Sequence, residues 1–147
     1  MKLASALVAI AFCLVACQAQ SDTQTPLGTS SPVASTSTKS QNQGAFIGQG
    51  HSTTGNTKIV TENGQKYLLL DSGFSTDNGP DLFVILHKSV PPQDYDAKNY
   101  VNLGKLEKTS GSQKYSIPAN INPQDFRSVA IWCRQFNVTF GYAPLAK

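Results

Sequence analysis

The residues best suited to redox or metal chemistry in this sequence are one cysteine, Cys133, and two histidines, His51 and His87. A thiolate with two imidazoles is the ligand set of a blue-copper centre, and either ligand type can hold a haem iron. No His or Met follows Cys133 at the short spacing that blue-copper proteins use, so copper is disfavoured. Haem with a Cys133 thiolate or a His51 axial ligand stays open as a cofactor, although the sequence alone identifies no cofactor.

Cys133 has two interpretations. It lies between Trp132 and Arg134, whose side chains face away from it in a regular strand. A redox thiol needs a nearby cation or dipole that stabilises the thiolate, whereas a buried cysteine behaves as a small hydrophobic residue. Cys133 is therefore the redox candidate, with His51 and Trp132 as candidate ligand or pocket residues, and the alternative is a core cysteine.

Gly79-Pro80-Asp81 is predicted to be a structural turn before a strand, because Pro fixes its φ and Asp can accept backbone N–H bonds. Asp71 and Asp77 could join Asp81 as oxygen ligands for calcium. Their spacing matches no calcium loop, and the sequence predicts no metal site.

Composition and motifs exclude several functions. The 12 Lys and Arg residues against 9 Asp and Glu give a net charge of +3, and from Lys58 onward they are scattered singly. Nucleic-acid binders usually show a concentrated basic stripe instead, so no nucleic-acid partner is expected. Because no catalytic triad order, HExxH motif or phosphate-binding loop is present, the sequence does not support enzymatic activity.

The first 17 residues have the pattern of a targeting signal. Lys2 precedes an apolar run from Leu3 to Ala16, which is too short to span a bilayer and is typical of a signal peptide. The run ends in Leu14-Val15-Ala16-Cys17, which resembles the lipobox of bacterial lipoproteins. The resemblance implies cleavage after residue 16 and lipidation of Cys17 with acyl groups such as palmitate. Several acyl chains would anchor the protein in the outer membrane or on the outer face of the cell membrane.

Residues 17–43 are predicted to form a disordered tether. In residues 18–43, 11 are Ser or Thr and five are Gln, with no aromatic residue. Such a segment buries too little apolar surface to offset its ordering entropy. Since Cys13 leaves with the signal and Cys17 is capped, no disulfide is expected.

Residues 44–147 are predicted to be an all-β domain, an antiparallel sandwich or barrel-like sandwich of many short strands. Asn63-Gly64 between Thr57–Glu62 and Gln65–Leu70 predicts a hairpin. Further strands are expected at 45–47, 82–86, 100–103, 104–108, 113–117 and in two segments after 128, with a one-turn helix near 122–126 capped by Asn122. Between Cys133 and Phe136 the apolar parity changes, which indicates a bulge or tight bend near Arg134-Gln135.

Six short motifs in this order resemble the electron-transfer DM domain, also called the DM-thirteen family. The resemblance covers residues 44–147, and the motifs are His51-x-x-x-Gly55, Gly79-Pro80-Asp81-Leu82, Leu103-Gly104-x-Leu106, Gly111-x-Gln113-x-Tyr115-x-Ile117-Pro118, Val129-x-Ile131-Trp132-Cys133-x-x-Phe136 and Phe140-Gly141-x-Ala143-x-Leu145. It implies an extracytoplasmic all-β module with a redox role centred on Cys133, as a bare thiol or as a ligand to a group such as haem.

Two functions remain. The first is a membrane-anchored redox or electron-transfer accessory module centred on Cys133. The alternative is a non-catalytic binding or assembly module in which Cys133 is a buried core residue. Both imply membrane lipid as a partner through Cys17 and a redox or surface protein as a second partner. Enclosure of the Cys133 sulfur by apolar neighbours would favour the alternative.

Overall fold

A computed structural model describes residues 42–146 of the chain, which form eleven β-strands and one short 3₁₀ helix. The strands are β1 (Gln43–Ala45), β2 (Ile47–Gly48), β3 (Thr53–Thr54), β4 (Asn56–Glu62), β5 (Gln65–Leu70), β6 (Ser75–Thr76), β7 (Leu82–His87), β8 (Tyr100–Lys105), β9 (Gln113–Ser116), β10 (Ser128–Cys133) and β11 (Val138–Pro144), and the 3₁₀ helix is η1 (Pro123–Asp125). No helix in these described residues is long and apolar enough to cross a membrane. The predicted signal peptide, Cys17 and most of the predicted tether lie outside the described residues.

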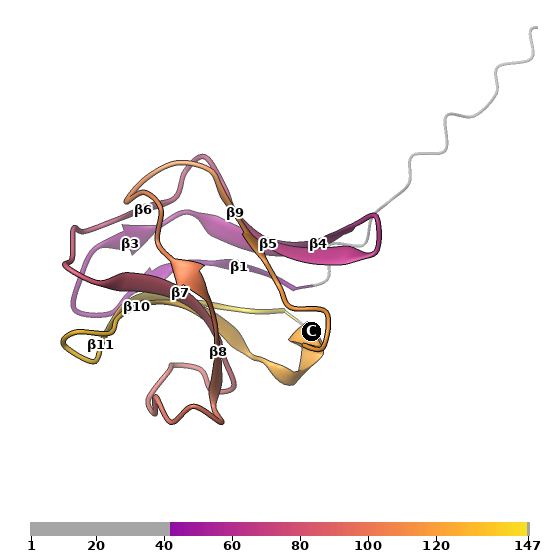
Figure 1. Cartoon of the computed structure of the whole chain (residues 1–147). Coiled ribbons are helices and arrows are strands. Elements are labelled where there is room, and N and C mark those ends of the chain that lie inside the picture. The colour runs from indigo at the N-terminus through magenta and orange to yellow at the C-terminus, as the bar shows by residue number, and fades with distance from the viewer. Residues whose placement is uncertain (1–41, 147) are drawn as a thin grey trace, which may run out of the picture. The chain divides into compact units, whose positions relative to one another are not determined.

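Two antiparallel sheets face each other and enclose the core (Figure 1). One sheet has the order β1-β4-β5-β9 and the other β2-β11-β10-β7-β8, while β3 and β6 form a two-stranded ribbon. The core draws aliphatic and aromatic side chains from both sheets, including Leu68 and Leu70 of β5, Val84 of β7 and Ile131 of β10. The predicted all-β antiparallel fold is confirmed.

The β4–β5 hairpin follows directly from its turn residues. Glu62 pairs with Gln65 across the turn, and Asn63 and Gly64 have φ values of 50° and 81°. A two-residue turn of this kind needs positive φ at both positions, which Asn and Gly tolerate. The predicted hairpin is present with the expected turn.

The central strands of the five-stranded sheet are covered on both faces. Along β7, Leu82, Val84 and Leu86 face the main core, whereas Ile85 belongs to a second cluster on the outer face of the sheet. This double coverage explains why β7 is apolar at both parities. The outer cluster lies under the segment that connects β7 to β8.

The one-turn helix is also confirmed, as η1. The side chain of Asn122 accepts a hydrogen bond from the backbone N–H of Gln124 at 3.3 Å, and Pro123 occupies the first helical position. Near it, Arg127 donates its backbone N–H to the carbonyl of His87 at 2.9 Å, which ties the start of β10 to the end of β7.

One local expectation about the strands is wrong, and another is correct only in part. The expected strands at 100–103 and 104–108 form one strand, β8, which ends at Lys105. Its pairing with β7 changes register between Val84 and Ile85, and this shift lets the strand continue through Gly104. The final hairpin turns at 134–137, so Phe136 is exposed (62%) and does not continue a strand with Phe140. The tight bend expected near Arg134-Gln135 is present as this turn, and a separate bulge lies farther back, between Ile131 and Trp132.

Candidate functional site

Cys133 occupies the last position of β10, paired with Leu82 of β7 and Val138 of β11. Its exposure is 0%, and it belongs to the main apolar core with Phe140 and Ile131. Within residues 42–146 its sulfur has no hydrogen-bond partner and is a free thiol. A thiol in such surroundings has no cation to stabilise the thiolate and no path to a reaction partner.

Arg134 follows Cys133 in the sequence, but its side chain contacts Asp81 and Phe83 instead of the sulfur. Its Nε donates to Oδ2 of Asp81 at 2.9 Å, and its guanidinium lies 4.4 Å from the ring centroid of Phe83. The Arg134 backbone N–H also donates to the Asp81 carbonyl. Lys105 is 3.9 Å from the same carboxylate, so Asp81 joins the β6–β7 turn, β8 and the β10–β11 turn at the surface.

Gly79 and Pro80 precede Asp81 in a segment that lies close against the core. A Cβ at Gly79 would be 2.8 Å from the Leu82 side chain and 2.9 Å from the Phe140 ring. A side chain at this position would have to displace Leu82 and Phe140, so the segment makes structural contacts.

His51 contacts two groups, neither of which is Cys133. Its ring stacks on Phe140 with centroids 3.6 Å apart, and its Nδ1 lies 3.4 Å from Oδ2 of Asp77. The His51 side chain is 39% exposed. The structure thus brings His51 to the rim of the core, but it does not join His51 and Cys133 in one site.

The three aspartates considered as oxygen ligands for calcium, Asp71, Asp77 and Asp81, also have separate partners. Asp71 accepts from the backbone and side-chain N–H groups of Asn56, and these bonds hold the pKa of Asp71 below its ordinary value. Asp77 accepts from the Ser52 backbone, while Asp81 pairs with Arg134. Among the described residues, no three His, Cys, Asp or Glu side chains lie close enough to bind one metal ion.

His87 is buried at the end of β7 and fastens the β7–β8 segment. Its Nδ1 accepts from the Ser89 backbone N–H at 3.0 Å, and its Nε2 lies 2.6 Å from the Asp94 carbonyl oxygen. Because Nδ1 accepts, Nε2 must donate, which fixes the neutral tautomer. This pair of bonds places Tyr95 over the outer face of the sheet.

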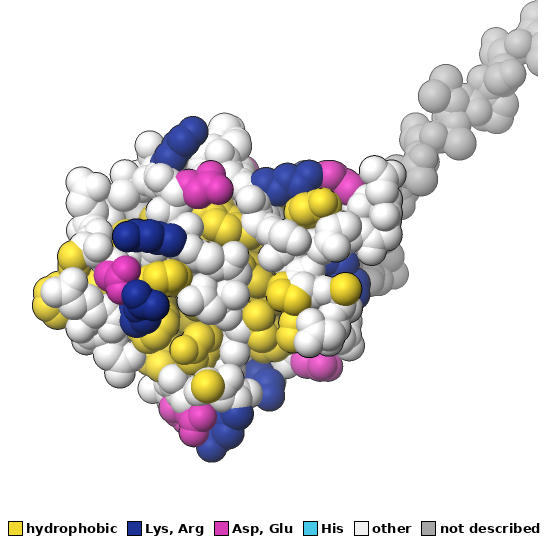
Figure 2. Space-filling model, viewed as in Figure 1, with side chains coloured by type: hydrophobic (Ala, Val, Ile, Leu, Met, Phe, Trp, Pro, Cys, Tyr) yellow, Lys and Arg dark blue, Asp and Glu magenta, His cyan; other side chains and the backbone are white. Residues whose placement is uncertain are grey.

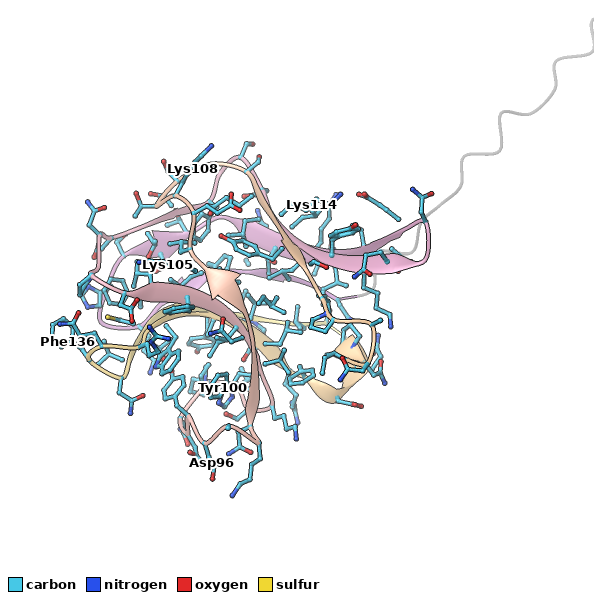
Figure 3. All side chains as sticks on the ribbon, in the orientation of Figure 1. Asp96, Tyr100, Lys105, Lys108, Lys114 and Phe136 are labelled. Atoms are coloured by element: carbon cyan, nitrogen blue, oxygen red, sulfur yellow. The ribbon has the colours of Figure 1, made fainter. Side chains whose placement is uncertain are left out.

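Trp132 lies on the face opposite to Cys133, in the outer cluster. It is 5% exposed and stacks on Tyr95 with centroids 4.9 Å apart and an interplanar angle of 10°. Tyr100 of β8 approaches the same indole at 5.4 Å and Phe83 approaches it at 6.5 Å. Figure 3 places Tyr100 on this side of the molecule, away from Lys114 on the other sheet.

Sequence reasoning missed the aromatic partners of Trp132. Strand alternation indicates that Trp132 and Arg134 face away from Cys133, and apolar residues at both parities of β7 indicate a second covered face. No local signal shows that Tyr95, in a Pro-flanked loop, reaches the indole. In Figure 2, hydrophobic side chains are visible at the surface on this side, between charged ones.

Of two hollows in the described part of the chain, neither is lined by Cys133 or His51. The larger, about 940 Å³, crosses the outer face of the four-stranded sheet between Lys58 and Lys114. The smaller, about 430 Å³, is lined by Gln49, Pro92, Gln93, Tyr95, Asn137, Val138 and Thr139. A haem liganded by Cys133 or His51 does not fit these surroundings, because the sulfur is enclosed and the imidazole is stacked on Phe140.

The geometry defines an all-β sandwich with an enclosed cysteine on one face of β10 and a buried tryptophan on the other. A family model described as Electron transfer DM13 matches residues 45–145, and the chain belongs to this family. Comparison with curated proteins gives no significant match, and neither does comparison with solved structures.

Proposed function

We propose that this protein serves electron transfer outside the cytoplasm as a lipid-tethered accessory module that binds a redox partner, and that Cys133 is a core residue. The family supports a role in electron transfer. One observation carries the assignment of Cys133: its sulfur is 0% exposed among apolar neighbours, and the nearest cation in sequence, Arg134, pairs with Asp81 instead.

The second candidate keeps Cys133 as the redox centre. The family description and the presence of only one free thiol within the described residues favour it. That role requires the thiol to lose a proton and an electron, and the surroundings offer neither a base nor an access route.

The lipid anchor is part of the proposal and rests on the Leu14–Cys17 pattern. A chain lipidated at Cys17 would be held at a membrane surface, where an accessory module could meet a partner that is also confined to the membrane. Confinement raises the effective concentration of the two proteins.

The test is electron export by intact cells of the native host. Deletion of the gene is expected to slow the reduction of ferricyanide, which does not enter cells, and wild-type protein and Cys133→Ala are expected to restore the rate equally. If Cys133→Ala is present at the wild-type level and fails to restore the rate, Cys133 is the redox centre. If deletion leaves the rate unchanged, the electron-transfer role is wrong.

A further inference from the structure

The exposed large hydrophobic side chains of the described residues all lie at the smaller hollow or within two residues of its lining. Val138 lines the hollow, and Phe136 is next to the lining residue Asn137 at the tip of the β10–β11 hairpin (Figure 3). Ile47 and Val90 are each two residues before a lining residue. Exposed apolar side chains that gather in one place mark binding sites, whereas scattered ones do not. The smaller hollow is therefore a candidate binding site.

The lining of this hollow combines uncharged polar groups with a few apolar ones. None of the described lining residues is charged, and three of them, Gln49, Gln93 and Asn137, carry a side-chain amide. The amides of Gln49 and Gln93 have no hydrogen-bond partner among the described residues. Asn137 accepts from the Trp132 Nε1–H through its Oδ1, so its NH₂ group is unused in this part of the chain. The hollow therefore presents three amide groups to which a ligand can hydrogen-bond.

Both walls of the hollow are fixed by hydrogen bonds of the fold. On one side, the backbone N–H of Lys88 donates to the Asn99 carbonyl at 2.9 Å and closes the β7–β8 segment, which His87 fastens from inside. On the other side, the backbone N–H of Gln49 donates to the Phe140 carbonyl at 2.8 Å. A hollow whose walls are already in place need not be ordered by its ligand, and this lowers the cost of binding.

We propose that this hollow binds a neutral saccharide, as one or two pyranose rings of a glycan. Sugar hydroxyls both donate and accept hydrogen bonds, and a primary amide offers a donor and an acceptor side by side, so each amide can bind two neighbouring hydroxyls. The C–H groups of the ring would pack on Pro92 and Val138. A charged ligand would find no counter-charge among the described lining residues. The volume of about 430 Å³ suits a compact ligand, whereas an extended peptide binds along a strand edge or a long groove. The inference goes beyond the electron-transfer role and does not depend on it.

Saccharide binding is tested by NMR on the purified full chain, labelled with ¹⁵N and kept in lauryldimethylamine oxide, a detergent without a sugar headgroup. Trp132 is the only tryptophan of the chain, so its indole N–H gives a single peak. Because that N–H donates to Asn137 at the hollow, a bound ligand is expected to shift the peak. The neutral probes are cellobiose, lactose, mannobiose and diacetylchitobiose. We expect at least one of them to shift the peak saturably, with a Kd of about 1 mM. Digalacturonate, an anionic disaccharide, and tetra-alanine, a peptide, are expected to leave the peak in place.

Substitution of one lining amide shows whether the saccharide binds in this hollow. Gln93→Ala removes an exposed amide from the wall, and we expect it to weaken binding of the same disaccharide about fivefold, the effect of one lost hydrogen bond. Gln124→Ala is the matched control, because Gln124 is an exposed glutamine of η1 that does not line the hollow. It is expected to bind the disaccharide like wild type, and thermal melts establish that both variants fold.

The saccharide site is overturned if none of the four neutral disaccharides shifts the indole peak. It is also overturned if Gln93→Ala binds as tightly as wild type, or if Gln124→Ala loses as much affinity as Gln93→Ala. Saturable binding of tetra-alanine alone would identify a peptide site, and binding of digalacturonate alone would identify an anion site, so either result rejects the proposal. Ferricyanide reduction is measured separately, so failure of the saccharide site leaves the electron-transfer role standing.

Discussion

Cys133 and Trp132 are adjacent in the chain, yet β10 directs them to opposite faces of the sheet. The sulfur enters the core between the two sheets, and the indole enters the outer cluster under Tyr95. Strand alternation alone produces this separation. At the scale of single residues, the Trp132-Cys133 pair is therefore divided between a thiol enclosed in the main core and an aromatic ring in the outer cluster.

Substitution of Cys133 distinguishes a core residue from a redox centre. Cys133→Ala leaves a small cavity and is expected to cost about 1 kcal/mol of unfolding free energy. Cys133→Ser is expected to be worse, because an enclosed hydroxyl without a partner costs roughly 1–3 kcal/mol. Urea unfolding measures both values, and Ser at least as stable as Ala would contradict the apolar surroundings.

Thiol reactivity provides an independent measurement for the same residue. In the native protein, Cys133 is expected to stay inert to iodoacetamide at neutral pH and to react only after unfolding. Labelling in native buffer at the rate found in urea would show that the thiol is accessible and would favour the second candidate function.

Asp71 is expected to make stability depend on acid pH. Hydrogen bonds from the Asn56 side chain and backbone hold its pKa below the ordinary value. A depressed folded pKa contributes stability above the unfolded value, about 3.9 for Asp, and that contribution is lost as the pH falls through the folded value. Wild type should therefore exceed Asp71→Ala in unfolding free energy by a constant margin near neutral pH. We expect the margin to shrink below about pH 4, and a margin that is constant into strong acid would contradict this role.

At the scale of elements, the sequence predicts the turns and helix starts that depend only on neighbouring residues. Asn63-Gly64 identifies the β4–β5 hairpin, and Asn122-Pro123 identifies η1, because turn and cap residues act on their own neighbours. The bulge near Ile131 could not be placed from the sequence, because it depends on how β10 pairs with β11. The change of parity near Arg134-Gln135 indicates the tight turn between the two strands, which is present at 134–137.

The residues that cover the outer face of the five-stranded sheet could not be predicted from the sequence, for a different reason. Tyr95 reaches Trp132 only because His87 and its bonds to Ser89 and Asp94 fold the β7–β8 segment back over the sheet. The partners of His87 are set by backbone geometry in a loop. Long-range contacts made by irregular segments leave no periodic pattern.

Gly55 is expected to be indispensable for the junction between β3 and β4. Its φ is +95°, and a Cβ there would lie 2.4 Å from the Cα of Phe74. Gly55→Ala therefore combines backbone strain with a collision against the main chain, and we expect a loss of at least about 3 kcal/mol of unfolding free energy. Thermal or urea unfolding measures the loss.

Gly50 provides the matched control for that substitution. Its φ is +80°, but a Cβ would meet nothing within 4 Å. Gly50→Ala should therefore cost only the strain of a left-handed residue, about 1 kcal/mol. Equal losses for the two variants would show that the contact with Phe74 has no energetic weight.

At the scale of the whole molecule, the first and last described residues lie together at one edge of the domain. Asn42 donates its backbone N–H to the carbonyl of Ala146 at 3.2 Å, and Ala146 donates to Gln43. The β10–β11 hairpin, which carries Phe136, lies on the other side in the view of Figure 1. The point at which the described chain begins therefore lies away from the β10–β11 hairpin in this view.

The anchor itself is tested by replacing the cysteine of the lipobox-like sequence. Cys17→Ser removes the thiol that would accept a diacylglyceryl group, so we expect no incorporation of labelled palmitate and accumulation of the unprocessed precursor. Cys13→Ser is the matched control: it removes a thiol from the same apolar run, four residues earlier, and should be lipidated and processed like wild type. Because several acyl chains anchor far more firmly than a single chain, the wild-type protein should stay with the membrane fraction after a high-salt wash. Labelled palmitate on the Cys17→Ser protein would place the lipid elsewhere and remove the basis for the proposed membrane tether.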